Sequence, residues 1–236
     1  MKLRCFVPSL VTAFLVASIS PLAVAAAVTF ADDFNAGASG LWGNEVGAWV
    51  TTGGTYGATF VPPNDFPSAH SSLPFVLSDF TVQFDANDIK DGGIWLRSSA
   101  AGATAVGRVG VMLVTGGRGG TGTGLYWHIV PNGSSYGSIL NEATGLFTSG
   151  VSDATIRVVV AGDTYSAYVG NAVTPATVLV TNTFASGQVA LVDSGPGVES
   201  FDNFQLAAVP EPATLALMIS GLAVLCAHTK KRIVSK

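Results

Sequence analysis

The central part of this 236-residue chain has no cysteine and few basic residues. Both cysteines, Cys5 and Cys226, lie near the ends, so residues 28–208 form no disulfide and offer no thiolate for zinc or for nucleophilic chemistry. The same residues hold five Lys and Arg against fourteen Asp and Glu. This acidic balance disfavours nucleic acid and anionic lipid as partners.

Residues 28–208 also lack a convincing amphipathic helix, and their apolar residues alternate with a period of two. Nine segments are predicted as strands: 80–84, 93–97, 109–114, 125–130, 155–160, 164–169, 178–183, 189–192 and 201–206. Gly, Asp, Asn and Pro separate them at short intervals. Around a dozen short strands predict one all-β domain, a sandwich or jelly roll.

The N-terminus has the pattern of a secretory signal peptide over residues 1–27. Lys2 and Arg4 precede an apolar run and then a stretch of small residues. Cleavage is expected after Ala27, and Ala25 or Ala26 would fit nearly as well. The pattern predicts export.

The last 28 residues, 209–236, have the pattern of a C-terminal sorting signal that acts at the membrane. They consist of a proline-rich tetrapeptide, a short apolar segment and a basic cluster: Val209, Pro210, Glu211 and Pro212; residues 213–227; and Lys230, Lys231 and Arg232. As a transmembrane helix the apolar segment would reach about 22 Å. This is short of the ~30 Å hydrocarbon core, so the span is marginal, and the basic cluster should stay in the cytoplasm.

This tail closely resembles the PEP-CTERM sorting tail of Gram-negative bacteria. The resemblance implies that the protein is held in the inner membrane until an exosortase removes the tail. The protein would then be released towards the envelope, the surface or the extracellular matrix. An ordinary C-terminal membrane anchor is the alternative.

Four short sequence segments in residues 29–207 resemble segments of a concanavalin A-like, laminin-G-like jelly roll. They begin at Asp32, Gly92, Thr155 and Phe201, and read D-D-F, G-G-I-W-L-R-S, T-I-R-V-V-V-A-G-D and F-D-N-F-Q-L. The resemblance implies that the first and last strands pair in one sheet. Members of this superfamily bind glycans, hydrolyse them, or serve as adhesive modules.

A secreted glycoside hydrolase is the alternative function, and it requires two facing carboxylates about 5 to 9.5 Å apart. Glu45, Glu142 and Glu199 are the glutamates of residues 28–208, and they fall in separate turns. The E-x-D-x-x-E motif of the laminarinase branch is absent. A distant pair, Glu45 with Glu142, is the remaining candidate, and we assign no catalytic residue.

Calcium is the candidate cofactor, because the chain is rich in the oxygen ligands that this ion prefers. The candidate structural site combines the two ends of the domain: Asp32, Asp33, Asp202 and Asn203. A second candidate is the turn at residues 85–92, which departs from EF-hand spacing. Ordinary capping of turns by Asp and Asn is the alternative interpretation for both.

Glycan binding requires exposed aromatic rings beside a few polar groups. Alternation in residues 93–97 places Trp95 and Arg97 on one face, away from the core, and these two with Tyr126 are the candidate glycan-binding residues. Tyr126 and His128 should share a face, with His128 towards solvent, while His70 is expected in a loop. A G-x-G-x-x-G match at residues 117–122 precedes a strand, so it is interpreted as a loop and not as a phosphate site.

The sequence thus predicts an exported, tail-sorted jelly-roll domain of the envelope or matrix. Its expected role is a non-catalytic glycan-binding or structural surface module. The expected partners are an exosortase-type enzyme and a polysaccharide or matrix glycan.

Overall fold

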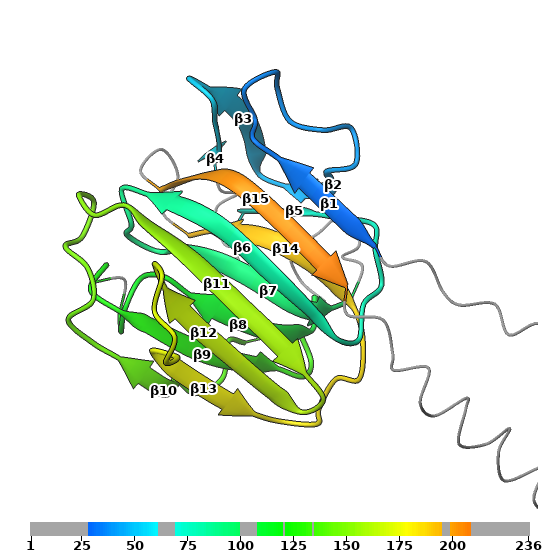
Figure 1. Cartoon of the computed structure of the whole chain (residues 1–236), viewed down its shortest axis with the longest axis vertical. Helices are drawn as coiled ribbons and strands as arrows, with labels where there is room; N and C mark the ends of the chain where they lie inside the picture. Colours follow the sequence, from blue (N-terminus) through cyan, green and yellow to red (C-terminus); the bar gives the residue numbers. More distant parts are fainter. Residues whose placement is uncertain are drawn as a thin grey trace, which may run out of the picture. The chain divides into compact units, whose positions relative to one another are not determined.

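Two antiparallel β-sheets stacked face to face form the described part of the chain in the computed structural model (Figure 1). The structure describes residues 28–60, 69–99, 108–119, 121–133, 135–194 and 199–208, with residues 44, 45 and 60 described for the backbone alone. The predicted signal peptide, sorting tetrapeptide and transmembrane helix 213–227 lie outside these residues.

The first sheet has eight strands. Seven follow the order β13-β12-β11-β6-β15-β4-β3, and β1 pairs with β15 beside them. The bounds are β1 Thr29–Asp32, β3 Ala48–Thr52, β4 Thr55–Phe60, β6 Phe80–Asn87, β11 Ala154–Ala161, β12 Thr164–Val169, β13 Thr177–Val180 and β15 Ser200–Ala208.

The second sheet has seven strands in the order β10-β9-β8-β7-β14-β5-β2. The bounds are β2 Gly43–Val46, β5 Ala69–Ser72, β7 Gly92–Ser98, β8 Gly110–Val114, β9 Leu125–Val130, β10 Leu140–Ala143 and β14 Gln188–Asp193.

The main core lies between the two sheets. Strand β6 shows why the chain folds this way, because Phe80, Val82, Phe84 and Ala86 are buried in strict alternation with partly exposed residues. One face of β6 therefore packs against the second sheet while the other meets solvent. The predicted all-β jelly-roll sandwich is confirmed, and the described residues contain no helix of the length and hydrophobicity that crossing a membrane requires.

The first and last strands pair as predicted. Strand β1 runs antiparallel to β15, with Thr29 opposite Ala207 and Asp32 opposite Phe204 (Figure 1). This pairing closes the first sheet around the two ends of the domain.

The second sheet differs from the first, because several of its strands are buried on both faces. Every residue of β5, β7, β8 and β14 is buried. Strand β5 carries His70, so the prediction of a loop at this histidine is wrong. Its sequence, Ala-His-Ser-Ser, has no apolar alternation from which a strand could be predicted.

Candidate functional site

Arg97 leaves the face that alternation predicts, because strand β7 contains a β-bulge. The register between β7 and β14 shifts near Arg97, whose φ is 45°. The bulge turns its side chain between the sheets, where the guanidinium lies 5.3 Å from the centroid of the Tyr165 ring. Trp95 keeps the opposite face. The predicted arrangement, with Trp95 beside Arg97 on an exposed face, is therefore wrong.

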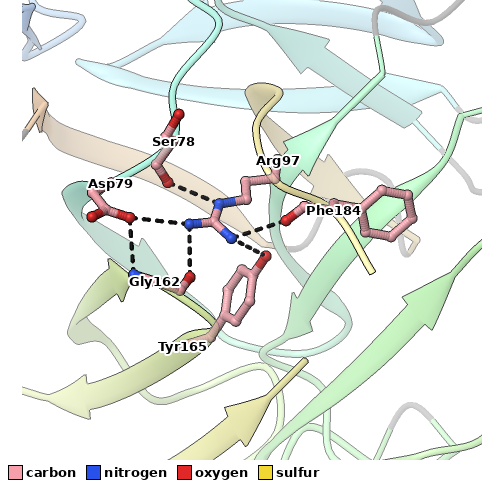
Figure 2. Close-up of polar contacts among 6 residues, drawn as sticks. All are labelled: Ser78, Asp79, Arg97, Gly162, Tyr165 and Phe184. Carbon is pink, nitrogen blue, oxygen red and sulfur yellow. Dashed lines mark hydrogen bonds and ion pairs between the residues drawn. The ribbon is translucent and has the colours of Figure 1, made fainter. Parts of the chain in front are cut away.

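The Arg97 guanidinium uses all its donors inside the protein (Figure 2). Nε donates to Ser78 O at 2.8 Å, Nη1 to Tyr165 Oη at 3.3 Å and Phe184 O at 2.9 Å, and Nη2 to Gly162 O at 2.8 Å and Asp79 Oδ1 at 3.1 Å. These five bonds match the five N–H groups of an arginine. Arg97 therefore joins the two sheets and has no donor left for a sugar.

A second apolar cluster, which we call the outer-face cluster, covers the side of the seven-stranded sheet that faces away from the core. Its buried members are Trp95, Met112, Val114, Tyr126, Val130, Ala190 and Val192, with Tyr136 and Ile139 packed against them. Trp95 is completely buried in this cluster, which contradicts its predicted exposure in a groove.

Strand β9 places its side chains on the faces that alternation predicts. Trp127 lies in the main core, whereas Tyr126 and His128 share the outer face with ring centroids 5.1 Å apart. His128 is only 6% exposed, so its predicted solvent-facing role is wrong. The cause is Tyr136, whose ring stacks on His128 with centroids 5.3 Å apart.

A pocket of about 220 Å³ opens beside this aromatic group. It is lined by Asp91, Met112, Val114, Gly119, Tyr126, His128, Tyr136 and Ser194. Its volume is below the roughly 300–1,000 Å³ of pockets for drug-sized ligands, so it suits a single sugar unit or a chain end. Apolar rings with a few polar groups at the rim are what a sugar requires.

Burial sets the charge state of the pocket. It raises the pKa of Tyr126, an effect that Asp91, Tyr136 and Glu142 increase, and it raises the pKa of Asp91 against the pull of Lys90. Burial also lowers the pKa of His128, although hydrogen bonds with the backbone at Ser138 and Tyr136 oppose this. His128 is therefore neutral at pH 7, with Nδ1 3.1 Å from Ser138 O, and it helps to hold Tyr136 over the sheet.

Asp91 is positioned by Glu199, a buried residue directly before strand β15. Glu199 Oε2 accepts hydrogen bonds from the backbone N–H of Lys90, Asp91 and Gly92, at 2.9, 3.1 and 2.7 Å. The Thr115 hydroxyl donates to Oε1 at 2.6 Å. Burial raises the pKa of Glu199 to about 8, although the bonds from Thr115, Lys90 and Gly92 oppose the shift.

The predicted calcium ligands are drawn to the same edge by the β1–β15 pairing, but Asp32 is already used. Its carboxylate accepts bonds from Phe34 N, Ser39 N and Trp42 Nε1, at 3.0, 2.8 and 2.9 Å. Asp33 and Asn203 line one hollow. Asp202 accepts a bond from the N–H of Asn203, and Asn203 Nδ2 donates to Asp85.

The arrangement fits a calcium ion poorly, because Asp32 stabilises the loop after β1. Among the described residues, no group of three or more His, Cys, Asp or Glu side chains is arranged to hold a metal. Calcium at this edge stays a prediction.

The carboxylate pair suggested for hydrolysis does not come together. Glu45 lies in β2 and Glu142 in β10, which form the two opposite edges of the seven-stranded sheet. Six strand spacings of about 4.8 Å place the two backbones far beyond the ~9.5 Å limit for glycoside hydrolysis. Asp91 is the one carboxylate among the described residues that line the pocket.

Two residues of this site were missed by sequence reasoning. Tyr136 follows the Pro-Asn-Gly turn in a polar segment, and a tyrosine after a turn carries no pattern that predicts packing on a sheet. Glu199 is separated by more than a hundred residues from the turn at residues 90–92 that it anchors. For Asp91 the sequence predicts only a place in the candidate calcium turn at residues 85–92.

Comparison with known proteins gives a match at the C-terminus. Residues 208–232 match the PEP-CTERM protein-sorting motif. The chain carries a PEP-CTERM sorting tail. This tail indicates an exported protein that is processed at the membrane. No curated protein shows significant sequence similarity to the chain.

Solved structures similar to this PEP-CTERM-tailed chain share its jelly-roll fold at low sequence identity. A Bacillus licheniformis β-glucanase is 11% identical, with a TM-score of 0.53 over 77% of this chain and 98% of the enzyme. A glycosidic hydrolase is 10% identical, with a TM-score of 0.52 over 78% of this chain and 96% of that one. The carbohydrate-binding module CBM66 from Bacillus subtilis is 16% identical, with a TM-score of 0.49 over 71% and 92%. The β-glucanase and the glycosidic hydrolase, with TM-scores above 0.5, confirm the predicted concanavalin A-like jelly roll at the level of the fold.

Proposed function

We propose that this protein is an exported glycan-binding module that an exosortase-type enzyme processes at the inner membrane. Its final place would be the envelope, the surface or the extracellular matrix. The observation that carries the binding function is the pocket formed by Tyr126, His128, Tyr136 and Asp91.

The chemistry of the pocket suits a sugar. The Tyr136 ring is half-buried and lies at the rim, where the apolar C–H face of a sugar can stack on it. Asp91 and Ser194 lie at the same rim and are partly exposed, so their oxygens can accept hydrogen bonds from hydroxyl groups. The neutral ring of His128 supports Tyr136 from below.

The number of carboxylates in the pocket agrees with glycan binding and disfavours hydrolysis. A hydrolase needs an acid and a second carboxylate across the scissile bond, and the described lining residues supply Asp91 alone.

The test is retention of the full-length chain during electrophoresis through gels that contain different polysaccharides. Retention on at least one glycan, lost in Tyr136→Ala, is the expected result. Uniform lack of retention would overturn the proposal and favour a matrix scaffold. Release of reducing sugar from any glycan would show hydrolysis and would contradict the non-catalytic assignment.

A further inference from the structure

A second arginine, Arg108, is buried on the outer face of the seven-stranded sheet without a counter-charge. Its side chain is fully buried, and it lies just before β8. Nη1 donates to Ser98 Oγ at 2.9 Å, and Nη2 donates to Ser72 Oγ. Nε has no hydrogen-bond partner. Two neutral hydroxyls are therefore its described partners.

Arg108 differs from Arg97 in having no carboxylate partner in the described part of the chain. Arg97 pairs with Asp79 and uses every donor, whereas no carboxylate of the described residues contacts Arg108. Acidic side chains outnumber basic ones in the chain, 15 to 11. Burial lowers the pKa of Arg108 to about 10, so it is still a cation at neutral pH. A buried cation without a partner is strongly disfavoured, and an anion from outside the chain would neutralise it.

The neighbours of Arg108 on this face supply further unused polar groups. Ala190 of β14 lies opposite both Trp95 of β7 and Ser72 of β5, and Gln188 lies opposite Ser98 in the next row. Trp95 Nε1 and Gln188 Oε1 are both buried without hydrogen-bond partners. The register therefore places an unused donor and an unused acceptor in the rows that hold Ser72 and Ser98, the two partners of Arg108.

We infer that Arg108 and Trp95 form an anion-binding site whose ligand is a carboxylate or a small inorganic anion of the same charge. The guanidinium keeps three N–H groups beyond its two serine bonds, and Arg is suited to hold a carboxylate through two of them. Trp95 Nε1 would donate to the same anion, and Gln188 Oε1 would accept from a neighbouring hydroxyl.

Two sources supply this chemistry, and the first rests on the proposed function. A glycan that contains uronate residues presents a carboxylate beside hydroxyl groups, which matches both the donors and Gln188. A small free anion satisfies Arg108 and Trp95 alone. Since both side chains are fully buried, either ligand reaches them only when the outer face opens, and association should be slower than at an exposed site.

Calorimetric titration of the full-length chain in chloride-free buffer tests the site with four probes: sodium glucuronate, sodium acetate, sodium chloride and glucose. Wild type should bind at least one anion, and Arg108→Met should bind it at least tenfold more weakly. Glucuronate binding tighter than acetate and chloride assigns the site to a uronate, and equal binding assigns it to a free anion. The control Arg157→Met removes the same charge from the other sheet and should change nothing.

A second measurement guards against misfolding of Arg108→Met. In buffer without these anions its melting temperature should equal or exceed that of wild type, because a buried unpaired charge is gone. Trp95→Phe removes only the Nε1 donor and should weaken anion binding several-fold.

Lack of anion binding by wild type, or equal weakening in Arg157→Met, would overturn the anion site. A strongly lowered melting temperature of Arg108→Met without anion would do the same. Retention on neutral glycans is independent of these results, so failure of the anion site and failure of the proposed function are distinguishable.

Discussion

At the scale of single residues, the two buried arginines differ in how many of their N–H groups form hydrogen bonds within the protein. All five N–H groups of Arg97 donate hydrogen bonds, which go to Ser78 O, Asp79 Oδ1, Gly162 O, Tyr165 Oη and Phe184 O (Figure 2). Nε of Arg108 has no hydrogen-bond partner in the part of the chain that the structure describes. Arg97 therefore connects the two sheets, whereas Arg108 is a candidate anion-binding residue.

Replacing Arg97 by Lys should destabilise the fold without affecting glycan binding. Lysine keeps the charge but cannot reproduce the planar fork, so several buried carbonyl groups lose their donor. We expect a loss of about 2–4 kcal/mol in the free energy of unfolding, measured with urea. Folded Arg97→Lys should be retained on glycan gels like wild type, and loss of retention by the folded variant would restore a direct role for Arg97.

Asp32→Asn tests whether the first-to-last strand edge depends on capping or on calcium. Asn offers one acceptor oxygen in place of two, so part of the set from Phe34, Ser39 and Trp42 is lost. A loss of roughly 1–3 kcal/mol in unfolding free energy is expected. The melting temperature of wild type should be unchanged by a chelator. A drop of the same size on chelation would instead assign a calcium ion to this edge.

Apolar alternation in the sequence predicted the face of a side chain correctly in some strands and wrongly in others. Alternation gave the correct faces for Tyr126 and Trp127, because β9 is regular. It failed at Arg97, since a bulge reverses the face of a single residue and leaves no pattern in the sequence. It also could not predict that the second face of the central strands is buried, because alternation separates two faces without saying what covers each.

At the scale of elements, the turn from β6 into β7 depends on Glu199. The carboxyl group joins the start of β15 to residues 90–92, and it thereby places Asp91 at the rim of the pocket. Gly92 allows this approach, because a Cβ there would lie 2.6 Å from the Glu199 carboxyl carbon. One buried side chain thus connects strand packing to the candidate site.

Glu199→Gln should remove a pH dependence of stability. The pKa of Glu199 is raised to about 8 in the folded state from 4.5, so its stabilising contribution is complete below pH 4.5 and is lost as pH rises towards 8. The loss is at most about 1.4 kcal/mol per pH unit. Gln resembles the protonated acid, because its oxygen can accept the three backbone bonds and its NH₂ can donate to Thr115.

Urea titrations between pH 5 and pH 8 compare the two proteins. Wild type should lose stability with rising pH, whereas Glu199→Gln should change less. Parallel curves for the two proteins would show that Glu199 is ionised throughout this range and that its hydrogen bonds outweigh burial.

At the scale of the whole molecule, a sorting tail is attached to an acidic jelly-roll domain. The strand pattern and the resemblances of the four short segments were sufficient for the fold class and for the pairing of the first and last strands. They did not predict strands β2–β5 or β10, which are short, from four to six residues, and have few apolar residues in alternation. The pocket arises from contacts between β9, the segment before β10 and the turn at Asp91, which no local pattern connects.

Intact-mass measurement tests the sorting proposal. The protein from culture medium or the outer envelope should lack residues 1–27 and part or all of residues 209–236, while an inner-membrane fraction should contain a form that keeps the tail. A mature released protein that retains residues 209–236 would contradict processing by an exosortase.

Glycan binding in the pocket at Tyr136 is the function proposed for the domain. Its most direct test is the dissociation constant of the best-retained glycan for wild type, Tyr136→Ala and Tyr168→Ala. Tyr168 is a matched control, since it is a partly exposed tyrosine on the first sheet, stacked under Arg157. A lost stacking ring is worth about 1–1.5 kcal/mol, so Tyr136→Ala should bind roughly tenfold more weakly, and Tyr168→Ala should match wild type. Equal affinity of Tyr136→Ala and wild type would contradict glycan binding in this pocket.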